Sequence, residues 1–225
     1  MPQIADSRNG KIVGGVASNQ ELARAKTSGT ATAELGNEPV AIQYFASPGR
    51  GGGTYRYIRT FLYFDTTSII AAPVNAKLKV AINTGLAQNS SDVIVVKSTA
   101  FGGDGSSEIT GNEFNALDFG TTYSEEATNW AGVNSMALSS GALEDMSDND
   151  FFIVALVDHD SDFQNADPFN GGSGSTSSGI NFAGTIVLDY TAAAGYGNKV
   201  NGVAAASIGR VNGVATSSIG KVNGV

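Results

Sequence analysis

The chain has 225 residues, of which 15% are charged and 29 are glycine, and its hydrophobic fraction of 41% is large enough for a folded core. The absence of cysteine excludes disulfides, Cys-ligated metal centres and thiol catalysis, and the single histidine, His159, excludes most multi-histidine metal sites. The net charge of −8 is unevenly distributed, because 15 acidic residues and no basic residue lie between Lys97 and Lys199. Such an acidic body argues against nucleic acid as a partner, since phosphate binding requires clustered lysine and arginine.

Residues 1–35 are expected to form an N-terminal arm that contacts neighbouring subunits. Within this arm, residues 20–26 have the composition of a two-turn helix. The longest apolar run, residues 12–17, is shorter than the core of a signal peptide, and no run approaches the roughly 18 apolar residues that span a bilayer. We therefore expect a protein that is made in the cytoplasm of its host cell and has no membrane as a partner.

Seven segments with β-strand patterns follow, in a body assigned to residues 36–192. Residues 75–83 alternate apolar and polar side chains with a period of two, and residues 182–190 do the same, as half-buried strands do. Residues 93–96 and 151–157 are continuous apolar runs rich in β-branched side chains, which is typical of central strands. Further strands are expected at residues 40–45, 55–65 and 133–138, and single helical turns at 107–116 and 142–146.

Short strands separated by loops rich in Gly, Asn, Asp and Ser predict an all-β fold. Its architecture is expected to be an antiparallel β-sandwich, jelly-roll-like, with extended N- and C-terminal arms. Trp130, the single tryptophan, is expected to pack in the core or to anchor a loop. The apolar strand faces predict a core that includes Leu78, Val80, Ile82, Val95, Ile153, Ile186 and Leu188.

Asp158, Asp160 and Asp162 place carboxylates at alternate positions, as the opening of a calcium-binding loop does. Because Ca²⁺ requires several oxygen ligands, these three residues are the candidate metal ligands, and Ca²⁺ is the candidate cofactor. The sequence then departs from the EF-hand pattern, with Phe163 in place of the glycine and Phe169 in place of the bidentate glutamate. This departure favours the alternative interpretation, a solvated acidic loop that holds no ion.

No pattern in the chain predicts catalysis. The single histidine has no Gly-Asp-Ser-Gly motif to accompany it, so no Ser-His-Asp triad is predicted. The glycine-rich residues 102–106 lack the Gly-Lys-Ser/Thr ending of a phosphate-binding loop. The aromatic residues of segment 55–64 either stack on sugars or form core and subunit contacts. Arg56 and Arg59 interrupt them, which predicts a sheet face that is polar or pairs with acids.

The C-terminal residues 193–225 contain an eleven-residue repeat. VNGVAAASIGR at 200–210 and VNGVATSSIGK at 211–221 are identical at eight positions. Asn-Gly between valines is a strong hairpin signal, but each repeat has too few apolar groups for a core of its own. The tail is therefore expected to gain extended or hairpin structure against a neighbouring subunit. The residues assigned to these assembly contacts are Lys199, Val200, Asn201, Gly202, Val203, Arg210, Val211, Asn212, Gly213, Val214, Lys221 and Val222.

Two resemblances bear on function. YRYIRTFLYFDTTSI at 55–69, followed by NAKLKV at 75–80, resembles the DNRLRE-type, carbohydrate-binding-module-like β-sandwich family over about residues 36–192. The chain departs from that family's pattern after Ile69 and after Asp158, so no sugar site is carried over. The tail is similar to the Lys-(Val/Ile)-Asn-Gly-Val repeats that end many bacteriophage structural proteins and some bacterial surface proteins. This second resemblance implies a virion component.

Together these features predict a non-enzymatic structural protein of a phage particle: a capsid decoration, head-fibre, collar or tail subunit. Its expected partners are copies of itself, as a homo-oligomer, and other virion proteins. The alternative is a carbohydrate-binding β-sandwich module of a surface adhesin or fibre, with a host-surface glycan as its partner. An enzyme of polysaccharide breakdown is a third class, and it would require a pair of carboxylates in a cleft.

Overall fold

The computed structural model describes residues 2–33, 42–47, 53–83, 91–167 and 176–193, together with the backbone of residues 210–211 and 214–215. These residues form an all-β protein in which neighbouring strands pair antiparallel, which confirms the predicted fold class. In this part of the chain, no helix has the length and apolar character needed to cross a membrane.

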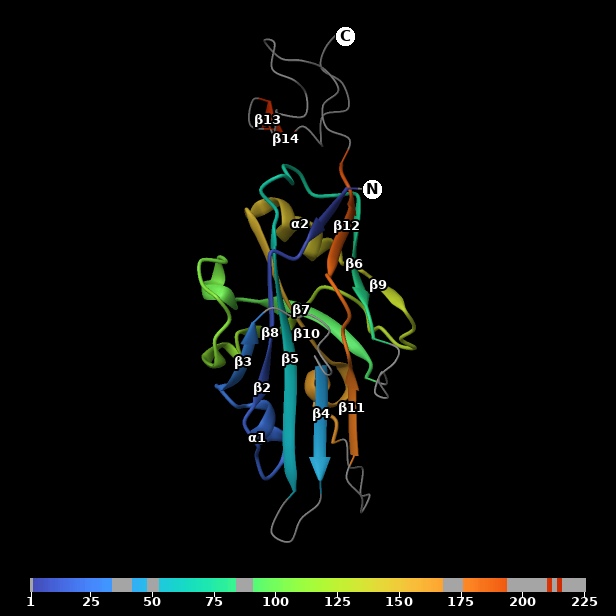
Figure 1. Ribbon diagram of the computed structural model, residues 1–225. Helices are drawn as coiled ribbons and strands as arrows, with labels where there is room; N and C mark the ends of the chain where they lie inside the picture. The colour runs from blue at the N-terminus through green and yellow to red at the C-terminus, as the bar shows by residue number, and fades with distance from the viewer. Residues whose placement is uncertain are drawn as a thin grey trace.

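Two sheets form the body (Figure 1). The smaller sheet contains, in spatial order, β1 (Gln3–Ala5), β12 (Val187–Thr191), β6 (Asn75–Ala81) and β9 (Val133–Ala137). The path through the larger sheet is β11 (Thr176–Ile180), β4 (Ile42–Ser47), β5 (Thr54–Asp65), β10 (Phe151–Asp158), β7 (Val93–Ser98) and β8 (Leu117–Thr122). Off this path, β2 (Arg8–Gly14) pairs with β5 and with β3 (Gly29–Ala33).

Helical segments are short and lie between strands. The expected N-terminal helix is α1 (Gln20–Arg24), and the Asn19 side chain caps it by accepting a hydrogen bond from the Leu22 backbone N–H. The later expected turns are η2 (Gly111–Glu113) and the longer α2 (Ser140–Asp148). Two further turns are η1 (Phe101–Gly103) and the π-helical turn η3 (His159–Phe163).

The N-terminal residues belong to the body and do not form the separate arm that we expected. β1 pairs with β12 at one end of the smaller sheet, and β2 pairs with β5 in the larger one. Ile12 on β2 is fully buried. Sequence analysis did not predict these strands, because they are short and rich in glycine and polar residues. Their pairing partners also lie far along the chain.

The larger sheet forks along the long strand β5. One edge of β5 is taken by β2 and by a bridge from Ala17 to Tyr55. On the other edge, residues 54–58 pair with β4 and residues 60–65 pair with β10. Arg59 is the residue between these two pairings, so β5 changes its neighbour at Arg59.

The body has two apolar cores, one on each face of the larger sheet. The first core lies between the two sheets and includes Leu78 and Leu188 from the smaller sheet and Leu62 and Val154 from the larger one. The second lies on the opposite face, where apolar side chains of segment 99–116 and of α1 pack with those of β5, β7 and β10. Burial on both faces explains why β7 and β10 are continuous apolar runs.

Burial agrees with the sequence prediction. All of the predicted core residues are buried, with Ile153 in the second core and the others in the first. Trp130 also belongs to the first core, and its indole N–H donates to the Ala127 carbonyl at 3.2 Å. In the tail, β13 (Arg210–Val211) pairs antiparallel with β14 (Val214–Ala215), so paired strands flank the Asn-Gly of the second repeat.

Leu78→Ala should lower the free energy of unfolding by about 2–5 kcal/mol, because Leu78 is fully buried and the substitution leaves a cavity. Val133→Ala on the adjacent strand is the control, since Val133 is 67% exposed, and it should change the free energy by less than about 0.5 kcal/mol. Urea denaturation followed by circular dichroism measures both values. Equal losses would contradict the assignment of Leu78 to the core.

Candidate functional site

A buried ion pair lies at the fork of the larger sheet. Arg59 is fully buried, and its guanidinium binds both carboxylate oxygens of Asp162, with Nε–Oδ2 and Nη2–Oδ1 distances of 2.7 Å. The remaining N–H groups donate to the Phe114 carbonyl at 2.9 Å, the Asn115 side chain at 3.1 Å and the Arg24 carbonyl at 3.1 Å. All five guanidinium donors therefore have acceptors, which is the condition under which a buried arginine is tolerated.

Asp162 belongs to η3, the turn that fills the opening of the fork. Gln20 of α1 donates to the Ser161 and Ala166 carbonyls, at 3.1 and 2.9 Å. The Tyr57 hydroxyl also donates to the Ser161 carbonyl, at 3.0 Å. Side chains from α1 and β5 thus hold this turn, although more than 100 residues separate it from them along the chain.

Asp158 begins the same turn and has a perturbed pKa. Its Oδ1 accepts hydrogen bonds from the Ser161 backbone N–H at 2.8 Å and from the Ser161 hydroxyl at 2.6 Å. Burial raises the pKa of Asp158 above its ordinary value, because the charged form loses solvation, and the hydrogen bonds from Ser161 oppose this shift only in part. Asp158 therefore keeps its proton to a higher pH than an exposed aspartate does.

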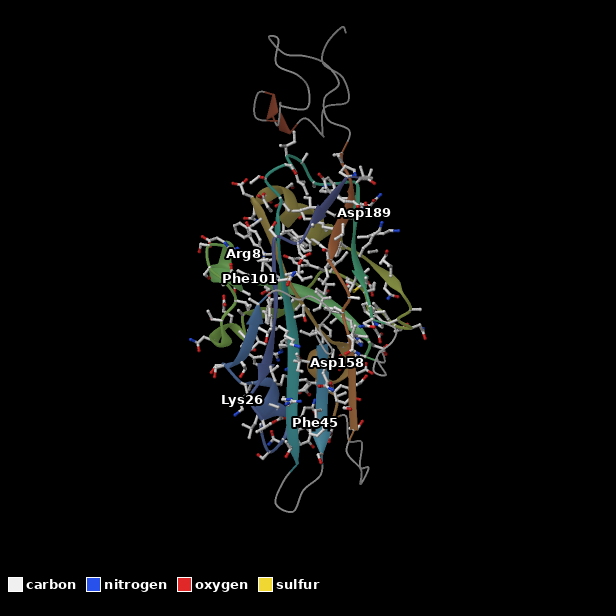
Figure 2. The ribbon with its side chains drawn as sticks, in the orientation of Figure 1. Arg8, Lys26, Phe45, Phe101, Asp158 and Asp189 are labelled. Carbon is white, nitrogen blue, oxygen red and sulfur yellow. The ribbon has the colours of Figure 1, made fainter. Side chains whose placement is uncertain are left out.

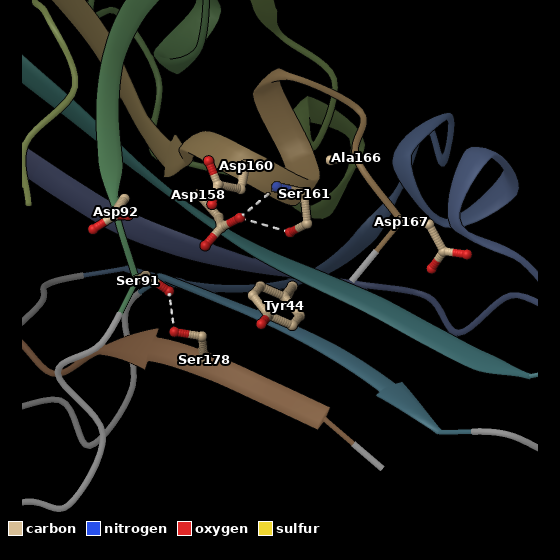
Figure 3. Close-up of a pocket in the computed structure, with 9 residues that line it drawn as sticks. All are labelled: Tyr44, Ser91, Asp92, Asp158, Asp160, Ser161, Ala166, Asp167 and Ser178. Carbon is tan, nitrogen blue, oxygen red and sulfur yellow. Dashed lines mark hydrogen bonds between the residues drawn. The ribbon is translucent and has the colours of Figure 1, made fainter. Parts of the chain in front are cut away.

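A cavity of about 490 Å³ opens beside this turn, between the diverging strands (Figure 3). Tyr44 reaches it from β4 and Ser178 from β11, and Ser91 and Asp92 border it from the start of β7. The Ser91 hydroxyl donates to the Ser178 hydroxyl at 3.1 Å. None of the described residues that line the cavity is basic; they are Tyr44, Ser91, Asp92, Asp158, Asp160, Ser161, Ala166, Asp167 and Ser178.

The structure separates the three predicted metal ligands. Asp162 points into the fork and pairs with Arg59, whereas Asp158 caps its own turn. Asp160 is exposed and pairs with His159. A π-helical turn directs the three carboxylates differently, unlike the alternation that the sequence pattern assumed. Ca²⁺ binding by these residues stays a prediction.

A different group of possible ligands adjoins the cavity. His159 Nδ1 lies 3.0 Å from Asp160 Oδ1 and 3.3 Å from Glu126 Oε1, and the imidazole stacks on Phe163 with ring centres 5.7 Å apart. Among the described residues, these are the three whose ligand atoms lie within 4.8 Å of one another. Two carboxylates beside an imidazole also form ion pairs with its protonated form, which accounts for the contacts without a metal.

The aromatic segment of β5 is mainly structural. Tyr57, Phe61 and Phe64 are buried, so for these residues the core interpretation is confirmed over sugar stacking. Arg59 pairs with an acid, as the interrupted apolar pattern predicted. Sequence reasoning missed the cavity residues Tyr44, Ser91, Asp92 and Ser178. They lie on β4, before β7 and on β11, and only the pairing of these distant segments brings them together.

The predicted assembly residues lie mostly outside the described part of the chain. Arg210, Val211 and Val214 are described in their backbone, within β13 and β14. Outside the described residues lie Lys199, Val200, Asn201, Gly202, Val203, Asn212, Gly213, Lys221 and Val222.

No model of a known protein family matches the chain, and no curated protein matches it significantly. The fold defines the class, an antiparallel β-sandwich with a polar cavity at the fork of its larger sheet.

Asp162→Asn should lower the free energy of unfolding by about 3–5 kcal/mol, because it leaves the Arg59 guanidinium buried without a counter-charge. Lys97→Met is the control. Lys97 pairs with Asp145 at 2.7 Å but is 42% exposed, so its loss should cost about 1 kcal/mol or less. The double substitution Arg59→Met with Asp162→Leu removes both charges and should recover part of the loss, but not all of it, because the Phe114 and Arg24 carbonyls also lose their donor. Urea denaturation measures all three, and a small loss in Asp162→Asn would contradict the structural role of the pair.

The raised pKa of Asp158 predicts a pH dependence of stability. The native state holds the Asp158 proton to a higher pH than the unfolded chain, where the pKa is about 3.9, so the free energy of unfolding should fall as the pH rises between the two values. Asp158→Asn does not titrate, so its stability relative to the wild type should improve between about pH 3 and about pH 7.

Asp118→Asn is the control for this pH dependence. Hydrogen bonds from Thr121 and the Gly120 N–H lower the pKa of Asp118, so that variant should lose stability relative to the wild type over the same pH interval. Urea denaturation at both pH values tests the pair, and changes of the same sign in the two variants would contradict the account.

Proposed function

We propose that this protein is a non-enzymatic structural or assembly protein of a phage particle, and that its C-terminal repeats join one subunit to the next. The observation that carries the proposal is the charge of the repeats. Lys199, Arg210 and Lys221 recur once per eleven residues, and residues 193–225 contain no acid. A periodic cation in a segment without acids is suited to binding an acidic surface at regular intervals.

The body provides such a surface. Residues 1–192 carry 10 basic and 21 acidic side chains, an excess of 11 negative charges. Several of the basic side chains form ion pairs with acidic side chains of the body, so they are not available to neutralise the acids outside these pairs. These pairs are Arg8–Glu108, Arg59–Asp162, Lys79–Asp189 and Lys97–Asp145. The surplus of acid on the body therefore favours a basic partner, and the tail of another copy has the required charge.

The described part of the body has two apolar cores of its own. The buried residues of both cores lie between Ile12 and Tyr190. These cores thus belong to the body, and we assign the tail to contacts between subunits.

The second candidate is a carbohydrate-binding module, and the cavity at the fork favours it. Sugar sites combine carboxylates and hydroxyls with an aromatic ring, and the cavity contains Tyr44, Asp92 and Ser178. In this alternative the glycan occupies the cavity and the tail attaches the module to a larger fibre.

Deletion of residues 196–225 should abolish self-association and leave the thermal unfolding midpoint of the body nearly unchanged, because the described part of the body has two apolar cores of its own. The full-length variant Lys199→Gln, Arg210→Gln, Lys221→Gln keeps the length of the tail and removes its charge, and it should weaken association in the same way. Sedimentation velocity measures association and calorimetry measures unfolding. Association of the truncated protein at the level of the full chain would overturn the proposal.

A further inference from the structure

The cavity at the fork has the chemistry of a receptor for cations. Asp92, Asp158, Asp160 and Asp167 contribute carboxylates to it, and the other polar groups on its wall are hydroxyls. An anionic ligand would meet only repulsion from these carboxylates. Asp158 is buried on this wall, whereas Asp160 is exposed at its rim.

The size of the cavity indicates which kind of cation fits. Among the described residues, the carboxylates of Asp92, Asp158 and Asp160 do not form a group with oxygens within 4.8 Å of one another, as a preformed chelate for a bare metal ion would. A volume of about 490 Å³ instead accommodates a long side chain with a charged end. Carboxylates spread around such a space can neutralise either an ammonium or a guanidinium group.

The tail of this chain supplies such side chains. The cation at the repeat junction is lysine at positions 199 and 221 and arginine at 210, so the repeat preserves the charge and the length but not the shape of the end group. Lysine and arginine do not replace each other at a site with fixed bidentate geometry, but they can in a roomy acidic one. Glycine precedes Arg210 and Lys221, and valine follows each of the three cations, so the neighbouring side chains are compact.

The cavity lies away from the end of β12, the strand that precedes the tail in the sequence. β12 leads toward the tail and ends near the N-terminal strand β1 and α2, at one end of the body (Figure 1). The cavity lies in the other half of the body, beside β4 and β11. Asp189 on β12 and Asp158 beside the cavity mark the two regions (Figure 2). The end of β12 and the cavity therefore lie in different halves of the body, an arrangement that suits a contact between two copies.

We propose that the cavity at the fork receives the basic side chain of a C-terminal repeat from a second copy of this chain. The contact joins two different surfaces, so it is heterologous, and repetition would give a ring or an open filament. This proposal rests on the proposed assembly function and specifies the acceptor for the tail.

The first experiment compares two full-length double variants by sedimentation velocity. Asp92→Asn with Asp160→Asn removes two charges at the cavity, and it should weaken self-association by at least about tenfold. Asp148→Asn with Asp150→Asn removes the same number of charges from exposed positions around the end of α2, and it should associate like the wild type. If the cavity variant also associates like the wild type, the proposal is overturned.

The second experiment adds a synthetic peptide of residues 199–221 to the full-length variant whose three tail cations are glutamine. Binding measured by calorimetry should occur, should weaken with rising salt, and should be lost when Asp92→Asn and Asp160→Asn are added. A peptide with glutamine at the three basic positions should not bind. Binding that survives the cavity substitutions would overturn the proposal, as would binding of Ca²⁺ or of a neutral oligosaccharide in the cavity with no binding of the peptide.

These outcomes separate the proposal from the assembly function on which it rests. If the charge-free tail abolishes association and the cavity variant does not, the tail assembles the protein through another acidic surface, and only the cavity assignment fails. If the charge-free tail associates like the wild type, both fail. Charge reversal provides a rescue: Asp92→Lys with Asp160→Lys should restore association when mixed with a protein whose three tail cations are glutamate.

Discussion

The buried pair of Arg59 and Asp162 is the constraint on which the geometry of the body depends. A β-strand that changes its neighbour partway leaves a gap where the two neighbours part, and in this protein the gap opens at Arg59. An apolar side chain there would leave the backbone acceptors of α1 and of segment 99–116 without donors. The guanidinium instead satisfies the Arg24 and Phe114 carbonyls while it lies over the Phe114 ring, 4.2 Å from its centre. A single side chain thereby joins β5, α1, segment 99–116 and η3.

The pair also explains why a polar cavity can exist in so apolar a body. The fork cannot close, because η3 occupies its opening and is held by Asp162, by Gln20 and by the Tyr57 hydroxyl. Fixing the turn in this way positions Asp158 and Asp160 at the side of the remaining space. The cavity is thus a consequence of how the sheet divides, and two of its four carboxylates, Asp158 and Asp160, come from the turn at the fork.

The sequence predicted what depends on local periodicity and missed what depends on distant partners. The alternation of apolar and polar side chains in β6 and the apolar runs of β7 and β10 identified the strands and their buried residues. In a strand, the positions of the apolar side chains indicate which faces are buried. β1, β2, β3, β8 and β11 are short or rich in glycine and small polar residues, and they are stable as strands only through pairing with segments far along the chain. At Arg59 the pattern indicated a polar face or an acidic partner, but not which acid, since Asp162 lies 103 residues away.

In the turn after β10, three aspartates that alternate in the sequence have different environments in the structure. In the sequence, Asp158, Asp160 and Asp162 are equivalent members of an alternating series. In the structure, the π-helical turn gives them three environments: Asp162 is buried against a guanidinium, Asp158 is buried against its own turn, and Asp160 is exposed beside His159. Removing a charge at Asp162 therefore acts on folding, whereas removing one at Asp160 acts on whatever approaches the cavity. Because the same short turn both occupies the opening of the fork and lines part of the cavity, the stability of the body and the charge of the cavity wall are set by neighbouring residues but can be altered separately.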